Sequence, residues 1–358
     1  MNPFKRVVAR TLEHAQKQFE SRRLRTLLTD EEALSVQTYR TFGTANRLHV
    51  KGRVLIDPRL APARDDATVL VNLLNAYRRL NSREVPNAEL ELRFGSLSTR
   101  VRSDEEGYFS AEIELKQTLV ADDSWVSIAI DVLAPQQIAG AAEAHVLIPP
   151  GNPECGIISD LDDTVMKTGA TALTSMVRTV LLENSHTREP FEGVADFYRA
   201  LQRGQGGSAL NPIFYVSSGP WNLYDLYADF MDIREVPAGP IMLTDYGIDE
   251  TKLIHPTHTD HKLSSIRTIF ETYPNLSFIL IGDSGQEDPE IYRQVVREFP
   301  KRVRAIYIRD VTLPERDRVI LETGNELQRE GVEMILVENT ALAAEHAAER
   351  GFIAPLRN

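Results

Sequence analysis

Two hydrophobic patterns follow one another along the chain and change near residue 150. Before that point apolar and polar residues alternate, most clearly in the stretches 50–55, 88–94 and 109–115. Alternation with a period of two is typical of half-buried antiparallel strands. The sequence at 104–107 indicates a turn, and residues 69–80 have helical periodicity. We therefore predict a β-rich domain over residues 50–148, preceded by a helical segment over residues 1–49.

After that point, short and continuous apolar runs alternate with segments of helical periodicity. The runs are 156–159, 212–216, 277–281, 303–308 and 332–337. Continuous apolar strands that alternate with helices predict an α/β fold with a doubly wound parallel sheet, buried on both faces. Three prolines at 149–153 indicate a stiff linker. The second domain is therefore expected to span residues 154–358.

Polar residues suited to phosphate chemistry follow these runs. They are Asp160 and Asp162 after the first run, Ser217, Ser218 and Gly219 after the second, Asp283 after the third, and Arg309 and Asp310 after the fourth. In a parallel sheet, such side chains meet at the carboxyl edge. One carboxylate can attack phosphorus while a second protonates the leaving oxygen. The segment 160–164 alone fits a capped helix start equally well, because Asp and Thr also cap helices.

The order of these motifs resembles the haloacid dehalogenase superfamily, and within it the bacterial relatives of the actin-patch-associated phosphatidate phosphatase family. The stretches that carry the resemblance are 159–164, 215–224, 261–262, 280–292 and 306–310. It extends from about residue 151 to the C-terminus. It implies a haloacid-dehalogenase-like fold and Mg²⁺-dependent hydrolysis of a phosphate monoester through an aspartyl phosphate. Phosphatidate at a membrane surface is the implied substrate.

The resemblance also implies a role for each motif residue. Asp160 is the expected nucleophile, Asp162 the general acid and base, Ser217 the phosphate-binding hydroxyl, Lys262 the motif lysine and Asp283 a magnesium ligand. An anionic nucleophile repels an anionic phosphate, so the site needs local positive charge. Mg²⁺ held by Asp160, Asp283 and a backbone carbonyl near Asp162 would supply it together with Lys262. Ser218, Gly219 and Arg309 are expected to contact the substrate, and Asp288 is expected to orient the metal site.

The β-rich region carries a fainter resemblance to small transthyretin-like β-sandwich modules. It rests on Gly52-Arg53-Val54 and on the later segment 104–109. We therefore expect a sandwich-like N-terminal domain. Residues 165–211 are expected to form either a small cap or part of the catalytic core, and a small cap would favour a large or surface-bound substrate.

Composition and charge limit the class of protein. The chain has 358 residues, a formal net charge of −12 and one cysteine, Cys155. This length predicts roughly two domains. The negative charge opposes nucleic-acid binding, and a single cysteine excludes an intramolecular disulfide framework. No apolar run approaches the roughly 20 residues of a membrane span, and no secretory signal is evident, so we expect a cytoplasmic protein.

Several features admit more than one interpretation. The basic residues at 5–25 suit either an anionic membrane surface or a helix docked on the protein body. His255, His258 and His261 suit a metal, substrate contacts or no direct role, and the aromatic row of Trp221, Tyr224 and Tyr227 suits packing or substrate contact. The sequence also leaves open the physiological substrate and its acyl chains, the role of the β-rich domain and the oligomeric state.

Two other functions remain alternatives to a phosphatidate phosphatase. One is a phosphatase of a soluble phosphorylated metabolite, and the other is a non-catalytic ligand-binding module. The presence of both Asp160 and Asp162 weighs against the second.

Overall fold

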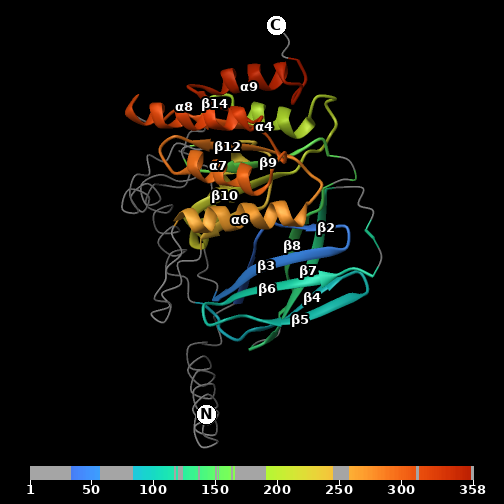
Figure 1. The fold of residues 1–358 in the computed structure, drawn as a ribbon. Coiled ribbons are helices and arrows are strands. Elements are labelled where there is room, and N and C mark those ends of the chain that lie inside the picture. The colour runs from blue at the N-terminus through green and yellow to red at the C-terminus, as the bar shows by residue number, and fades with distance from the viewer. Residues whose placement is uncertain are drawn as a thin grey trace, which may run out of the picture.

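The computed structural model contains a β-rich part and a parallel sheet covered by helices (Figure 1). The residues that the structure describes are 34–56, 84–116, 118–119, 124–135, 138–149, 151, 153–162, 164–165, 191–244, 258–311 and 314–355. The helix predicted at 69–80 and residues 1–33 of the predicted N-terminal segment lie outside them. The division of the chain into domains at 49/50 and 149–153 stays a prediction.

Among the described residues, eight strands form the β-rich part. They are β1 (Leu34–Thr38), β2 (Thr41–Thr44), β3 (Arg47–Ile56), β4 (Glu89–Phe94), β5 (Leu97–Arg102), β6 (Tyr108–Glu114), β7 (Trp125–Ala134) and β8 (Ile138–Leu147). They pair in the order β1-β3-β2-β8-β7-β4-β5, with β6 on β3. Strand β2 joins two groups, because it pairs antiparallel with β3 and parallel with β8. The three alternating stretches of the sequence are confirmed as β3, β4 and β6.

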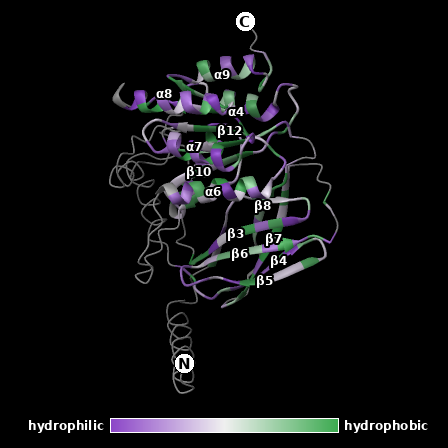
Figure 2. Cartoon of the chain, viewed as in Figure 1, coloured by the Kyte–Doolittle hydropathy of each residue, from purple (hydrophilic) through white to green (hydrophobic). Residues whose placement is uncertain are grey.

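The alternation of these strands buries one face. In β4, for example, Leu90 and Leu92 are fully buried while Arg93 is exposed. Apolar side chains of β3, β4, β6, β7 and β8 lie in one hydrophobic core. The sheet therefore curves around its own apolar face, and green and purple positions alternate along its strands in Figure 2.

Residues 34–49 differ from the prediction. They form β1, β2 and the start of β3, so the predicted helical segment is wrong there. The residues from Leu34 to Thr38 do alternate with a period of two, and Gly43 lies where no side chain fits. An ideal Cβ at Gly43 would lie 2.4 Å from the carbonyl oxygen of Arg47. The short strands therefore close tightly against β3.

The described residues of the second part contain six parallel strands. They are β9 (Gly156–Asp160), β10 (Ile213–Pro220), β11 (Ile241–Thr244), β12 (Phe278–Asp283), β13 (Val303–Arg309) and β14 (Glu333–Val337), in the order β11-β10-β9-β12-β13-β14. The predicted parallel sheet is confirmed, and five of these strands coincide with the predicted apolar runs. The order reverses at β9, whose neighbours are β10 and β12. A crevice at such a switch point is where parallel α/β sheets bind ligands.

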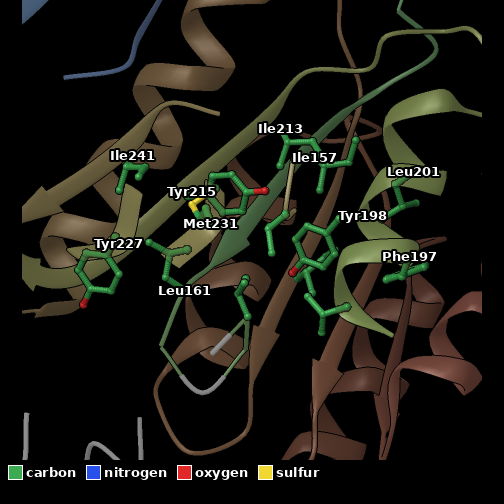
Figure 3. Close-up of a cluster of buried hydrophobic side chains, with 14 of the residues drawn as sticks. Ile157, Leu161, Phe197, Tyr198, Leu201, Ile213, Tyr215, Tyr227, Met231 and Ile241 are labelled. Atoms are coloured by element: carbon green, nitrogen blue, oxygen red, sulfur yellow. The ribbon is translucent and has the colours of Figure 1, made fainter. Parts of the chain in front are cut away.

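Helices cover both faces of this sheet. They are α4 (Val194–Arg203), α5 (Tyr224–Ile233), α6 (His258–Thr272), α7 (Asp288–Glu298), α8 (Pro314–Arg329) and α9 (Thr340–Glu349). Helices α4, α5 and α9 share one core with the sheet, and α6, α7 and α8 share the other. Figure 3 shows the first core, where Ile157 and Tyr215 of the sheet lie near Tyr198 of α4. The haloacid-dehalogenase-like assignment of this arrangement stays a prediction.

The two parts pack against each other through aromatic residues. The Phe42 ring of β2 meets Phe214 of β10 edge to face, with ring centroids 5.4 Å apart. The Tyr273 hydroxyl, just after α6, donates a hydrogen bond of 2.8 Å to the carbonyl oxygen of Gly43. The β-rich part therefore contributes directly to the cores of the parallel sheet.

Candidate active site

The site is built around Asp160, at the carboxyl end of β9. This carboxylate is 1% exposed, and the Nζ atom of Lys262 lies 2.7 Å from its Oδ1 atom. The same ammonium group donates to Asp288 Oδ1 at 2.6 Å and to Gln286 Oε1 at 3.3 Å. Helix α6 therefore brings a buried cation against the end of the central strand.

Three carboxylates converge around this ammonium group. Oxygen atoms of Asp160, Asp283 and Asp288 all lie within 4.8 Å of one another, and all three residues are buried. Asp283 ends β12 and Asp288 begins α7, so both come from the strand–helix junction beside β9. Gly282 makes this approach possible, because an ideal Cβ at that position would lie 2.5 Å from Asp288 Oδ2.

The charges of this cluster do not balance. Ionised, the three carboxylates carry one charge each, against the single positive charge of Lys262. Burial raises the pKa of Asp160 well above its ordinary value, against the lowering effect of Lys262, and Asp288 and Asp283 raise it further. Burial alone would lower the pKa of Lys262, but Asp160 and Asp288 raise it above its ordinary value, so this side chain stays protonated.

The same carboxylates fit a hard divalent cation. Among the described residues, Asp160 Oδ2 is buried and accepts no hydrogen bond. A buried carboxylate oxygen without a donor is costly unless a cation compensates for it. Mg²⁺ takes oxygen ligands and keeps several waters, so a few carboxylates suffice. Asp160, Asp283 and Asp288 are therefore the residues that would hold such an ion.

Asp162 lies in a separate network of hydroxyl groups. Ser217 Oγ donates to Asp162 Oδ2 at 2.6 Å, and the Tyr227 hydroxyl lies 3.1 Å and 3.2 Å from the two carboxylate oxygens. The backbone N–H of Gly219 donates to Ser217 Oγ at 2.9 Å. Both oxygens of Asp162 therefore face O–H groups carried by β10 and α5, while Asp160 faces Lys262.

Backbone groups of the loop after β12 orient Asp283. Its Oδ1 atom accepts hydrogen bonds from the N–H groups of Gly285 and Gln286, at 2.7 Å and 3.0 Å. Arg316 of α8 donates to the carbonyl oxygen of Gln286 at 3.1 Å and to Glu290 at 2.8 Å. Arg316 thus fixes the loop after β12, and this limits the positions that the Asp283 carboxylate can take.

The structure brings together five of the predicted site residues. Around the end of β9 it places Asp160, Asp162, Ser217, Lys262 and Asp283. Ser218 and Gly219 lie on the same β10 segment as Ser217, and Ser218 is partly exposed. Their predicted roles toward a substrate stay predictions.

Arg309 lies apart from this group. Its Nη2 atom donates to Thr340 Oγ1 at 2.9 Å, and its guanidinium lies 4.0 Å from the Phe191 ring centroid. Burial lowers its pKa. Within the part of the chain that the structure describes, Arg309 makes no hydrogen bond to the Asp160 cluster. The geometry therefore gives its predicted substrate contact no support.

Of the three histidines, the structure describes the side chain of His261. Residue 255 lies outside the described residues, and the side chain of residue 258 is not described either. His261 directly precedes Lys262 on α6. The metal and substrate alternatives for this group stay untested.

Three contributions to the site were not predicted. The Asp288 carboxylate lies in the cluster itself, whereas we expected it only to orient the metal site. Gln286 contacts Lys262, with Nε2 also 3.3 Å from Asp283 Oδ2. Tyr227 reaches Asp162. The dense polar run at 283–288 was a signal for the first two, whereas the Tyr227 contact depends on the placement of α5.

A family model matches the part of the chain that contains most of these residues. Residues 155–310 match the model of a family described as the catalytic domain of phosphatidate phosphatase APP1. Every site residue described above except Arg316 lies inside this range. The matched range is less than half of the chain.

Two fungal proteins are similar in sequence to parts of this chain. Phosphatidate phosphatase APP1 of Saccharomyces cerevisiae is 28% identical over 270 residues, which cover 71% of this chain and 44% of that protein. An uncharacterized protein of Schizosaccharomyces pombe is 33% identical over 158 residues, covering 43% of this chain and 25% of its own length. The chain therefore covers less than half the length of either relative.

A carbohydrate acetylesterase of Xanthomonas citri is a weak match among solved structures. It has 12% sequence identity and a TM-score of 0.29, and the match covers 77% of this chain and 68% of the esterase. No helix in the described part of the chain is long and apolar enough to cross a membrane.

Proposed function

We propose that the chain is a Mg²⁺-dependent phosphatidate phosphatase with a haloacid-dehalogenase-like catalytic domain. The observation that carries this proposal is the buried Asp160 carboxylate, which faces Lys262 and two further carboxylates while Asp162 is held nearby by two hydroxyl groups. The family match over residues 155–310 and the name of the yeast relative support the reaction and the substrate.

Asp160 acts as the nucleophile in this proposal. A carboxylate oxygen forms a bond to phosphorus, and the bond from phosphorus to the glycerol oxygen breaks. Lys262 lies against Asp160 and neutralises charge that the phosphate brings into the site. Asp160, Asp283 and Asp288, with a backbone carbonyl near Asp162, would hold Mg²⁺, which supplies further positive charge beside the phosphate.

Asp162 carries the proton in both halves of the reaction. It donates a proton to the departing glycerol oxygen, which leaves as the hydroxyl of diacylglycerol. It then takes a proton from the water that attacks phosphorus, and the aspartyl phosphate is hydrolysed to phosphate and free Asp160. Ser217 donates to Asp162 in this structure, and in this proposal it donates to a phosphoryl oxygen when the substrate is bound.

A lipid substrate would require the protein to act at a membrane surface, and we propose the cytoplasmic side. The net charge of −12 opposes binding to anionic lipid, so local contacts must hold the protein there. The basic residues at 5–25 are the segment of the sequence best suited to this contact.

The test is phosphate release from dispersed phosphatidate, lysophosphatidate and soluble phosphomonoesters, each with Mg²⁺ or with EDTA. We expect Mg²⁺-dependent release from phosphatidate and background release from the Asp160→Asn variant. Asp196→Asn is the matched control, because Asp196 lies on α4 with its carboxylate paired to Arg199 at the surface. Efficient turnover of a soluble phosphate with none of phosphatidate would reject the lipid substrate, and activity in folded Asp160→Asn would reject the mechanism.

A further inference from the structure

We infer that the β-rich part positions the general acid of the catalytic site, through an aromatic contact between Tyr39 and the segment that carries Tyr227. This inference rests on the proposed role of Asp162. It gives the β-rich part a task in the reaction, because residues far from the substrate then determine how well a proton reaches the leaving oxygen.

The contact is centred on Tyr39, which follows β1 and is 1% exposed. Its ring centroid lies 4.4 Å from that of Trp221 and 4.6 Å from that of Tyr224. The Nζ atom of Lys51, on β3, lies 4.1 Å from the Trp221 ring centroid. Tyr39 thus belongs to the hydrophobic core of the parallel sheet although it is part of the β-rich chain segment.

Polar contacts at Arg40 reinforce the aromatic packing. The backbone N–H of Arg40 donates to the Tyr224 hydroxyl at 2.6 Å. Its guanidinium donates to both carboxylate oxygens of Asp232, at 2.9 Å and 2.8 Å. Tyr39 and Arg40 therefore hold both ends of α5, since Tyr224 begins that helix and Asp232 lies in its last turn.

The segment held in this way leads directly to Asp162. Strand β10 carries Ser217 and ends at Pro220, the 3₁₀ helix η1 spans Trp221–Leu223, and α5 begins at Tyr224. One turn into α5, the Tyr227 hydroxyl reaches the Asp162 carboxylate and points out of the apolar cluster in Figure 3. There is little space between Gly219 and Tyr227, because an ideal Cβ at Gly219 would lie 2.5 Å from the Tyr227 hydroxyl.

Neither η1 nor α5 has a side-chain cap. Pro220 and Leu223 occupy the two N-cap positions, and neither side chain accepts a hydrogen bond from the helix it precedes. Local sequence therefore does little to fix where α5 begins. The aromatic and polar contacts of Tyr39, Arg40 and Lys51 supply the constraint instead, so the position of Tyr227, and with it Asp162, depends on the β-rich part.

A purely structural role predicts a different result from a positioning role. Loss of interdomain packing alone would lower stability and reduce activity toward all substrates by the same factor. Misplacement of the general acid would harm poor leaving groups most, because activated aryl phosphates need little proton donation. The ratio of activities on an alkyl and an aryl phosphate therefore separates the two roles.

The experiment compares Tyr39→Ala with Tyr39→Phe, which keeps the aromatic ring against Trp221 and Tyr224. Tyr273→Ala is the matched control, because it removes another aromatic contact between the two parts but does not touch η1 or α5. Each variant is assayed with Mg²⁺ on a soluble alkyl phosphate and on p-nitrophenyl phosphate, beside Asp162→Asn. We expect Tyr39→Ala to lose about tenfold to a hundredfold on the alkyl phosphate and much less on the aryl phosphate. Tyr39→Phe and Tyr273→Ala should keep the parent ratio.

Hydrogen exchange gives a readout that does not depend on activity. In Tyr39→Ala, peptides covering residues 217–228 should exchange faster, while those covering 262–272 of α6 should not change. If Tyr39→Ala does not fold, Tyr224→Phe replaces it, because it removes only the acceptor of the Arg40 N–H. It should shift the ratio and the exchange in the same direction by a smaller factor.

The outcomes separate this inference from the proposed function. A parent-like ratio and unchanged exchange in Tyr39→Ala, with a shifted ratio in Asp162→Asn, would overturn the positioning role alone. An equal shift of the ratio in Tyr273→Ala would also overturn it, because any loosening of the interface would then suffice. A parent-like ratio in Asp162→Asn would overturn both the acid role and the inference that rests on it.

Discussion

Replacement of Lys262 by methionine tests whether the site is built to receive a cation. Methionine retains most of the side-chain volume and removes the charge. In the parent protein the ammonium group lies 2.7 Å from Asp160 and 2.6 Å from Asp288, and Lys262 is 3% exposed. The variant therefore leaves two buried carboxylates facing each other without their shared partner.

The expected loss of stability is large. Removing one partner of a buried ion pair destabilises a protein by about 3–5 kcal/mol, because the remaining charge stays buried. At roughly 2–4 °C per kcal/mol for a unit of about 200 residues, the melting temperature should fall by about 6–20 °C. The melting temperature of the variant should fall most in EDTA. Mg²⁺ should raise it again in part, because a ligand that binds only the folded state stabilises that state.

The assay is thermal unfolding of the parent and the variant, each in EDTA and in Mg²⁺. Lys116→Met is the matched control, because Lys116 is exposed after β6 and its loss should change the melting temperature by a degree or two at most. A fall no larger than that of Lys116→Met would refute the buried charge argument. A large fall that Mg²⁺ does not reduce would refute the idea that the carboxylates bind the ion.

Three further substitutions test separate parts of the site. Asp283→Ala should raise the Mg²⁺ concentration needed for half-maximal phosphate release, and an unchanged requirement would exclude this carboxylate as a ligand. Asp162→Asn should slow hydrolysis of alkyl phosphates by about a hundredfold or more but aryl phosphates less, and equal losses on both would count against an acid role. Gly282→Ala should displace Asp288 and lower stability by about 1–3 kcal/mol, measured by urea unfolding, because the added Cβ would lie 2.5 Å from a carboxylate oxygen. A normal unfolding midpoint and normal Mg²⁺ dependence in that variant would show that the loop accommodates the methyl group.

The parallel sheet could be predicted from the sequence because its strands are buried on both faces. Short and continuous apolar runs are typical of such strands, and from them we predicted β9, β10, β12, β13 and β14. Strand β11 was missed because it has only four residues, Ile241–Thr244, behind two prolines. Strands β1 and β2 were missed because they are short and partly polar. Both pair with β3, which follows them closely in the chain, and β2 also pairs with β8, which is distant in sequence.

The site was predictable where a residue follows a strand, and less so where a helix supplies it. Asp160 and Asp283 end their strands, so the parallel arrangement alone brings them to one edge. The contact of Lys262 came only from the family resemblance, because a lysine on a helix is usually solvated. For Tyr227 the sequence showed an aromatic row and could not show which ring reaches a carboxylate. That contact depends on the position of α5, which residues 39 and 40 help to fix from another part of the chain.

The two aspartates of the motif lie two residues apart and have different chemical surroundings. Asp160 ends the strand and faces the ammonium group of Lys262, which is the environment that we propose for the nucleophile. Asp162 lies two residues later and turns toward the hydroxyl groups of β10 and α5, which can exchange protons. The sheet fixes the first environment, because β9 and β12 hold their ends together. Packing of α5 against the β-rich part fixes the surroundings of Asp162. The two aspartates therefore differ in their surroundings because different parts of the chain provide them.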